Sequence, residues 1–356
     1  MYTTLSHLCA LCVHHSVFGF VGMVIVILLS MTTGVSSQTP EWMVYTTENS
    51  GLPYNQVIAL AFDAQDNLWI GTNHGGLAKF NGETWTVYNT GNSGLPSDQV
   101  TALAFDARGT LWIGTGGGLV RFDGETWMVY NTENSELPYN PIHEIIFDPQ
   151  GNLWIGTGRF FEYGGGGLAK FDGETWTVYT AENSELPGNQ ILALALDPQG
   201  NIWIGAELRG EGVAKFDGKT WTVYTSENSE LPRGAPPALT FDAQGNVWVA
   251  SYGGGLAQFD GETWTVYNRR NSGLPNDSLH SGLLFDGQGK LWIGTERGVA
   301  TFDGESWMVH NEDNSGLPNN FIMILALDTQ GNTWIGTNGG LAVYREGGVI
   351  LKGMNK

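Results

Sequence analysis

The chain has 356 residues, of which 41% are hydrophobic, and a formal net charge of −20. The apolar content is sufficient for a sizeable core, whereas the acidic charge excludes a nucleic-acid-binding protein, because phosphate binding depends on clusters of lysine and arginine. The combination of 51 glycines with only 13 prolines indicates many tight turns and excludes a collagen-like or disordered chain.

The N-terminal segment contains no Asp, Glu, Lys or Arg before Glu41, and an apolar run of 13 residues, VFGFVGMVIVILL, begins at Val17. This run has the length of a signal-peptide core and is shorter than the roughly 20 residues that span a bilayer. We predict that residues 1–37 are a signal peptide, or an uncleaved membrane anchor if the apolar run is extended. Either interpretation places the rest of the chain outside the cytoplasm, in the periplasm, at the cell surface or secreted. Cys9 and Cys12 are the two cysteines and both precede the apolar run, so the exported part is expected to have no disulfide.

The 14 tryptophans fall into two series of seven with the same spacing. One series occurs in W-[IV]-[GA] units, the other precedes VY or VH, and successive members are 42 to 49 residues apart. This period is typical of a propeller blade of four short strands. The first series is Trp69, Trp112, Trp154, Trp203, Trp248, Trp292 and Trp334, and the second is Trp42, Trp85, Trp127, Trp176, Trp221, Trp264 and Trp307.

Residues 56–88 illustrate one period, with four strand-like runs separated by turn signals. The runs are QVIALAF, NLWIGT, GLAKF and TWTVY, in that order. An Asp-x-x-Gly-Asn turn, as in residues 148–152, joins the first run to the second, and Asn-Gly or Asp-Gly joins the third to the fourth. Each period is therefore predicted to be a four-stranded antiparallel blade, in which the aspartate after the first strand stabilises the turn.

The order of the runs predicts how the ring of blades closes. The series of fourth strands begins at residues 42–45, before any first strand, and the chain ends with a first, a second and a third strand. We expect residues 42–45 to pair with 340–344 as the outer strand of the last blade, because closure removes open sheet edges. The predicted fold is thus an all-β, seven-bladed β-propeller over residues 38–346, with a C-terminal tail at 347–356. An open solenoid, or an outer strand supplied by the tail, is the alternative.

The unit NLWIGT…GGLAKFDGETWTVYNTENSGLP resembles the two-component regulator propeller repeat, and the resemblance extends from residue 41 to about 345. It implies a bacterial, extracytoplasmic sensor-type propeller that responds to external ligands, often oligosaccharides. We expect no kinase, receiver or DNA-binding domain, and therefore a sensor-like fold without a transmitter. A separate membrane signalling protein is one partner that the resemblance implies.

The loops between second and third strands share one face of the propeller with the loops that lead from one blade to the next. We call this the upper face. In blade three the second-to-third loop expands to TGRFFEYGGGGL, which inserts Arg159, Phe160, Phe161 and Tyr163. Aromatic rings stack on sugars or extended peptides, and arginine supplies directional hydrogen bonds, so this loop is a candidate ligand contact. The alternative is that its aromatic side chains pack on the neighbouring blade.

The neighbouring blades also carry irregular residues at the upper face, which predicts a single patch over blades three to six. Blades four to six vary the same loop type, and one histidine lies at the upper end of a first strand. These candidate ligand contacts are Glu207, Arg209, Tyr252, His280 and Arg297.

Glu144 is a charged residue within a first strand, four positions before the terminal aspartate, where the other blades have small or apolar residues. A carboxylate there is costly unless it is paired or reaches water. It is therefore either a ligand contact or a structural partner of an arginine such as Arg159. Strand alternation is expected to point His143 to the opposite side of the strand.

No catalytic or metal motif is present after the N-terminal segment: the four histidines there, His74, His143, His280 and His310, form no HExxH and no close pair with metal-ligand spacing. We therefore expect an exported, non-catalytic propeller without a cofactor, which binds an oligosaccharide, a peptide or another protein. Two alternatives remain open. One is a propeller lyase or carbohydrate-active enzyme that uses Glu144, His143 and His280 at the axis, and the other is a purely structural cell-surface module.

Overall fold

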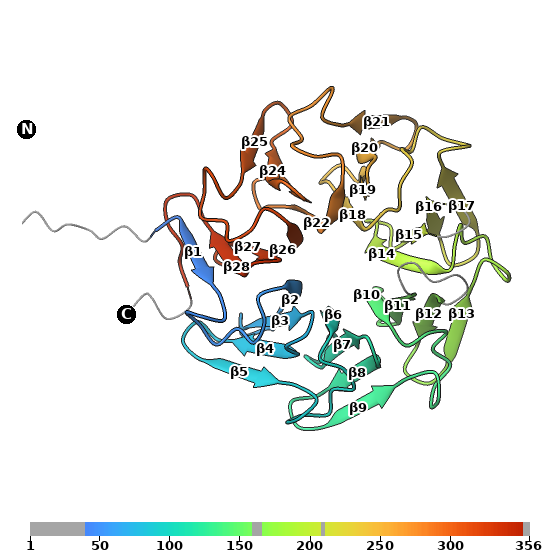
Figure 1. Ribbon diagram of the computed structural model, residues 1–356. Coiled ribbons are helices and arrows are strands. Elements are labelled where there is room, and N and C mark those ends of the chain that lie inside the picture. The colour runs from blue at the N-terminus through green and yellow to red at the C-terminus, as the bar shows by residue number, and fades with distance from the viewer. Residues whose placement is uncertain (1–39, 159–165, 208–210, 352–356) are drawn as a thin grey trace, which may run out of the picture. The chain divides into compact units, whose positions relative to one another are not determined.

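The computed structural model describes residues 40–158, 166–207 and 211–351, which all lie in one compact unit, 38–356. In this part of the chain, 28 β-strands form seven separate four-stranded antiparallel sheets. The sheets are arranged as blades around a central axis (Figure 1). The predicted seven-bladed propeller is therefore confirmed. Within the same three ranges the structure contains no helix with the length and apolarity of a membrane span.

Every blade has the same order of strands from the axis to the rim. The innermost strands of blades one to seven are β2 (Val57–Phe62), β6 (Val100–Phe105), β10 (Ile142–Phe147), β14 (Gln190–Leu196), β18 (Ala238–Phe241), β22 (Leu279–Phe285) and β26 (Ile322–Leu327). The second strands are β3 (Leu68–Thr72), β7 (Leu111–Thr115), β11 (Leu153–Thr157), β15 (Ile202–Glu207), β19 (Val247–Ser251), β23 (Leu291–Thr295) and β27 (Thr333–Thr337).

The two outer positions complete each blade. The third strands are β4 (Leu77–Phe80), β8 (Gly118–Phe122), β12 (Gly167–Phe171), β16 (Gly212–Phe216), β20 (Gly255–Phe259), β24 (Gly298–Phe302) and β28 (Leu341–Tyr344). The outermost strands are β5 (Trp85–Tyr88), β9 (Trp127–Tyr130), β13 (Trp176–Tyr179), β17 (Trp221–Thr225), β21 (Trp264–Tyr267), β25 (Trp307–His310) and, in blade seven, β1 (Trp42–Tyr45).

The second strand of each blade forms the centre of the packing between blades. In β3 all five residues, LWIGT, are buried, because both faces of the strand are covered by neighbouring blades. A Cβ atom at Gly71 would lie 2.6 Å from the carbonyl oxygen of Val100 and 2.8 Å from Cβ of Ala59. The glycine of the WIGT unit therefore allows the innermost strand of the next blade to approach closely.

The aspartate after each innermost strand has the turn role that the sequence predicts. Oδ1 of Asp148 accepts backbone hydrogen bonds from Gln150 and Asn152 at 3.0 and 2.8 Å. Its Oδ2 accepts a hydrogen bond from Nε1 of Trp154 at 2.9 Å. The same bond from the tryptophan indole recurs in all seven blades at 2.9 to 3.5 Å. One carboxylate thus stabilises both the turn and the buried tryptophan of its blade.

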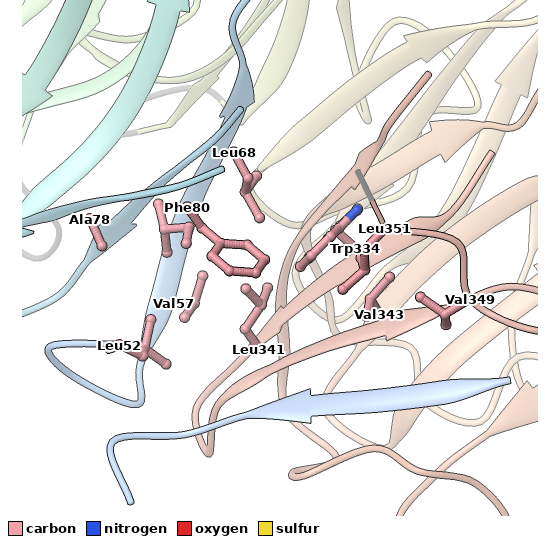
Figure 2. Close-up of a cluster of buried hydrophobic side chains, with 11 residues drawn as sticks. Leu52, Val57, Leu68, Ala78, Phe80, Trp334, Leu341, Val343, Val349 and Leu351 are labelled. Carbon is pink, nitrogen blue, oxygen red and sulfur yellow. The ribbon is translucent and has the colours of Figure 1, made fainter. Parts of the chain in front are cut away.

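The ring closes between the N-terminal strand and the last blade, as predicted. Residues of β1 pair with β28 in antiparallel register from Trp42 opposite Tyr344 to Tyr45 opposite Leu341. The segment after β28 runs beside β1, where the N–H of Val349 donates to the carbonyl oxygen of Pro40 at 2.9 Å. Figure 2 shows the buried cluster at this junction, to which blades one and seven both contribute. Because β1 occupies the outer position, the tail is not the outer strand of blade seven.

Candidate functional site

A cavity of about 760 Å³ lies at the axis of the propeller and opens on the upper face. Its rim includes Asn73, Gly116 and Gly158, which follow second strands, and Tyr139 and Asn140, which precede an innermost strand. Its wall receives a residue from the innermost strand of every blade or from the position next to it, and Ile142 of blade three lines it as well. The seven corresponding residues are Ile58, Thr101, His143, Leu192, Pro237, Ser281 and Met323.

A β-bulge places the lining residue in most blades. In β10, Ile142 pairs with Thr157 and Glu144 with Gly156, so His143 is an extra residue between the two pairs. A bulge of this kind changes the direction of a side chain, so that it no longer follows the regular alternation between the two faces of the strand. The same shift of register occurs at Ile58 in β2, Thr101 in β6, Leu192 in β14 and Met323 in β26.

The bulge changes the expected environment of His143. Regular alternation would separate its side chain from the site, whereas in the structure His143 lines the axial cavity. Burial lowers the pKa of His143 to about 4, although a hydrogen bond with the backbone of Gly158 acts in the opposite direction. The imidazole is therefore uncharged at neutral pH.

Glu144 follows His143 on the same strand and is enclosed by protein, although it keeps some exposure to solvent. Burial raises the pKa of its carboxyl to about 7, and a hydrogen bond from the backbone N–H of Ile145 to Oε1 at 3.2 Å opposes this shift. Within the described ranges Glu144 forms no ion pair with Lys, Arg or His. Its carboxyl thus titrates near neutral pH beside the wall of the cavity.

One side of the cavity has a chain of amide side chains that the sequence analysis did not identify. Nε2 of Gln56 donates to Oδ1 of Asn338 at 2.8 Å, and Oε1 of Gln56 accepts from Nδ2 of Asn73 at 2.6 Å. Nε2 of Gln99 then donates to Oδ1 of Asn73 at 2.9 Å. We call these four residues the amide arc, and it links blades seven, one and two. The available signal was the glutamine that precedes the first strand in blades one and two.

The opposite side of the cavity has an aromatic residue, Tyr252, with carboxylates near it. Tyr252, after β19, lines the cavity and pairs with Ser278 through an isolated β-bridge. Its ring centroid lies 5.1 Å from that of His280 in an edge-on arrangement. The pKa of Tyr252 is raised to about 12, mainly by burial and further by the negative charges of Glu207 and Glu296. The charges of Glu207 on blade four and Glu296 on blade six therefore both act on the hydroxyl of Tyr252 on blade five.

Glu296, after β23, is held by two neighbours and faces a buried histidine. Its Oε1 accepts from Oγ of Ser278 at 3.1 Å and its Oε2 from Nδ2 of Asn276 at 3.3 Å. Nε2 of His280 lies 3.5 Å from Oε1 of Glu296, but it makes no hydrogen bond within the described part of the chain. His280 is only 8% exposed, and its ring centroid lies 4.4 Å from that of Phe321.

Glu207 ends β15 and lies opposite Gln190 of β14. Burial raises the pKa of Glu207, and the negative charge of Glu211 raises it further. Glu211 accepts a hydrogen bond from the backbone N–H of Gly234 through Oε2 at 2.8 Å. Gln190 is fully buried, and neither its Nε2 nor its Oε1 has a hydrogen-bond partner.

The structure brings some of the predicted site residues together. Tyr252 and His280 are in contact, and Glu207 is within the electrostatic reach of Tyr252. Glu144 lies on blade three, next to the lining residue His143, and Arg297 is exposed, with its backbone N–H bonded to Oγ1 of Thr295 at 3.0 Å. The remaining predicted contacts lie outside the described residues and stay predictions: Arg159, Phe160, Phe161, Tyr163 and Arg209.

No metal centre is evident at this site. The described residues contain no group of three or more His, Cys, Asp and Glu side chains arranged to hold a metal ion. The arrangement offers hydrogen bonding from the amide side chains, an aromatic ring and nearby carboxylates.

Two models of known protein families match segments of this chain. The model of the SMP-30/gluconolactonase/LRE-like region matches residues 84–263, just over half of the chain. The two-component regulator propeller model matches residues 51–74, 273–297 and 316–339. Comparison with curated protein sequences gave no significant match.

Several solved propellers share the fold at low sequence identity. One is an extracellular domain assigned to the hybrid two-component system BT3049 of B. thetaiotaomicron, with a TM-score of 0.73 and 22% identity. The match covers 86% of this chain and 41% of that one, so this chain spans about two fifths of the length of the solved extracellular domain. PorZ, a surface component of the type-IX secretion system of Porphyromonas gingivalis, has a TM-score of 0.65 and 18% identity, covering 85% of this chain and 48% of PorZ.

A third similar structure is an enzyme. Virginiamycin B lyase from Staphylococcus aureus has a TM-score of 0.64 and 14% identity, and the match covers 85% of this chain and 97% of the lyase. At these identities the structural likeness establishes the fold alone. From the family models, the chain belongs to the SMP-30/gluconolactonase/LRE-like family and contains two-component regulator propeller repeats.

Proposed function

We propose that this protein is an exported, non-catalytic propeller that binds an oligosaccharide or a peptide in the axial cavity of its upper face. The observation that carries the proposal is the contrast between the blades and the cavity. The blades repeat one framework, whereas the cavity wall has a different residue from almost every blade. Variation confined to a concave surface on a rigid scaffold is typical of a binding site.

The size and lining of the cavity support this proposal. Ligand pockets commonly have volumes of about 300 to 1,000 Å³ and combine apolar walls with a few directional polar groups. Ile58, Leu192 and Met323 supply apolar surface, and the amide arc supplies paired donors and acceptors. Tyr252 supplies an aromatic ring on the opposite side, which suits a sugar ring or an extended peptide.

The predicted blade-three insertion is part of the proposed site. Arg159, Phe160, Phe161 and Tyr163 are expected to add aromatic and hydrogen-bonding contacts, because the insertion follows Gly158, which lines the cavity. Arg209 belongs to the corresponding loop of blade four. With Glu144, Glu207, Tyr252, His280 and Arg297, these residues form the proposed recognition patch.

The proposed location is outside the cytoplasm, with residues 1–37 as a signal peptide or an anchor. The apolar run that begins at Val17 and the fold shared with extracellular and cell-surface propellers support this location. A separate membrane signalling protein is the proposed partner for a sensor role, with no nucleic acid involved.

A second candidate function is a lyase or carbohydrate-active enzyme, and it is favoured by the bulge in β10. The bulge places the uncharged His143 on the cavity wall beside Glu144, whose carboxyl has a pKa of about 7. A base and an acid that titrate in different ranges are the elements of general acid–base catalysis. Turnover of a bound ligand that is lost in His143→Ala, with binding retained, would support this function.

Binding is tested by screening glycan and peptide panels by calorimetry with the full chain, its Ser281→Trp variant and its Ser306→Trp variant. Ser281 is an exposed residue of the cavity wall, whereas Ser306 is exposed in a hairpin turn of the same blade on the opposite face. We expect Ser281→Trp to abolish or strongly weaken binding, because the indole would project from the wall and obstruct the cavity, and Ser306→Trp to leave binding unchanged. Binding that survives Ser281→Trp would contradict the proposed site, and absence of any ligand would favour a structural module.

A further inference from the structure

Three carboxylates are grouped near Tyr252, on the aromatic side of the cavity. Glu207 and Glu211 come from blade four, Glu296 comes from blade six, and Tyr252 of blade five lies between these blades. None of the three carboxylates forms an ion pair with a described Lys or Arg. Carboxylates elsewhere in this chain do have such partners: Lys79 lies 3.3 Å from Asp63, Lys215 lies 3.1 Å from Asp197, and Arg269 lies 3.1 Å from Asp277.

The negative charges in this cluster act on one another. Glu211 raises the pKa of Glu207, and Glu207 and Glu296 both raise the pKa of the Tyr252 hydroxyl. Like charges that share a partly buried site disfavour their own ionised forms, and a cation that enters the site removes this penalty. The cluster therefore favours the binding of a positively charged group, which no described Lys or Arg supplies.

Two buried polar side chains beside these carboxylates provide an independent observation. Nε2 of His280 points to within 3.5 Å of Oε1 of Glu296 and makes no hydrogen bond with the described protein. Gln190, opposite Glu207 on the paired strand, has an amide with no hydrogen-bond partner on either side-chain atom. A buried polar group without a partner is destabilising, so such groups are found at places where a ligand supplies the missing hydrogen bond.

We propose that the ligand carries an ammonium group, which binds over the ring of Tyr252 between Glu207 and Glu296. This inference rests on the proposed function and names the chemical class of the ligand. An ammonium group has three hydrogen-bond donors and a charge, which match two carboxylates and an aromatic face. An amino sugar and the lysine side chain of a peptide both present this group.

The first step of the test compares ligands that differ only at the nitrogen. Calorimetry with the full chain at pH about 6.5 uses a deacetylated chito-oligosaccharide against its N-acetylated form, and a lysine peptide against its acetyl-lysine form. We expect at least one amine to bind about tenfold more tightly than its acetylated counterpart. The arm that shows this preference distinguishes an amino sugar from a basic peptide. Equal affinities within both pairs would overturn the inference.

The second step tests whether the preference for the amine depends on Glu207 and Glu296. The double variant Glu207→Gln/Glu296→Gln should lose most of the preference for the amine, whereas Glu262→Gln/Glu305→Gln, in exposed hairpin turns of the opposite face, should retain it. Both variants change the net charge by the same amount, so a general attraction of cations to the acidic protein would affect them equally. Equal effects of the two variants would overturn the inference.

The outcomes separate this inference from the proposed function. Binding of acetylated probes that Ser281→Trp abolishes, without a preference for amines, would retain the cavity as the binding site and reject the ammonium class. Absence of binding by every probe in both pairs would count against the inference, and the wider panel would then decide the proposed function.

Discussion

Nε1 of Trp154 donates a hydrogen bond to Oδ2 of Asp148 at 2.9 Å, which joins the turn after the innermost strand of blade three to the buried tryptophan of the next strand. The bond has a counterpart in every blade, so it is part of the repeat and not of the binding site. It explains why the aspartate and the first tryptophan of each period occur together.

Asp148→Ala is therefore expected to reduce the free energy of unfolding by about 2 kcal/mol, because it leaves the buried indole N–H without an acceptor and weakens the turn. Urea unfolding followed by tryptophan fluorescence measures the change. Asp172→Ala is the matched control, since Asp172 accepts backbone hydrogen bonds in an exposed hairpin turn. Similar losses in the two variants would show that the indole bond contributes little.

Trp42→Ala tests the closure of the ring. The Trp42 ring centroid lies 4.6 Å from that of Tyr344 and 5.5 Å from that of His310, so it connects the first strand to the last two blades. Trp127 is the equivalent residue in blade two, where no chain end is involved. In a closed ring both substitutions should cost about 3 kcal/mol of unfolding free energy. A much smaller cost for Trp42→Ala, in the same urea experiment, would indicate that the ring is open.

Gly71→Ala tests the close approach between blades one and two. The added Cβ would meet the backbone oxygen of Val100 at 2.6 Å, which cannot be relieved by a change of rotamer. We expect a loss of about 2 kcal/mol or more in the free energy of unfolding. Gly287→Ala is the control, because no atom lies within 4 Å of its Cβ position, and it should be neutral or slightly stabilising. Equal thermal midpoints for both variants would contradict the predicted packing.

The raised pKa of the Glu144 carboxyl predicts how the free energy of unfolding depends on pH. Burial raises its pKa from the ordinary value of 4.5 to about 7, so the folded protein holds a proton that the unfolded chain has released between these values. The free energy of unfolding therefore falls as pH rises from about 4.5 to about 7, by roughly 3 kcal/mol, and then levels off. Glu144→Gln should remove this fall and be more stable than the natural protein at pH about 8.

Urea unfolding of both proteins across this pH range measures the difference, and Glu305→Gln, in an exposed turn, should leave the profile unchanged. The two stabilities should converge near the lower end of the range, where Glu144 is protonated in both states. Parallel profiles for Glu144→Gln and the natural protein would show that Glu144 is not enclosed as described.

The fold could be predicted from the sequence because the evidence is local and repeated seven times. Each period contains its own turn residues and its own alternating strands, and the position of the Trp42 strand before the first complete period indicates how the ring closes. The position of His143 could not be predicted, because a bulge is a change of backbone register that leaves the pattern of residue types nearly unaltered. For this reason strand alternation gave the wrong direction for this side chain.

The candidate site was only partly predictable for a related reason. Tyr252 and His280 were assigned to one face from the loop type and strand end that carry them, and they are in contact in the structure. The amide arc joins Gln56 to Asn338, which are 282 residues apart, and neither residue is unusual in its own loop. Contacts of this kind depend on the curvature of the ring, which no single period encodes.

Binding at the axis is tested by hydrogen exchange of the backbone amides with and without a ligand found in the panels. A ligand in the cavity should slow exchange at the upper-face segments that line it, including those around Asn73, His143 and Tyr252, and should leave exchange unchanged in the hairpin turns of the opposite face around Asp172 and Asp303. Protection confined to the opposite face or to the outer strands would contradict a binding site at the axis.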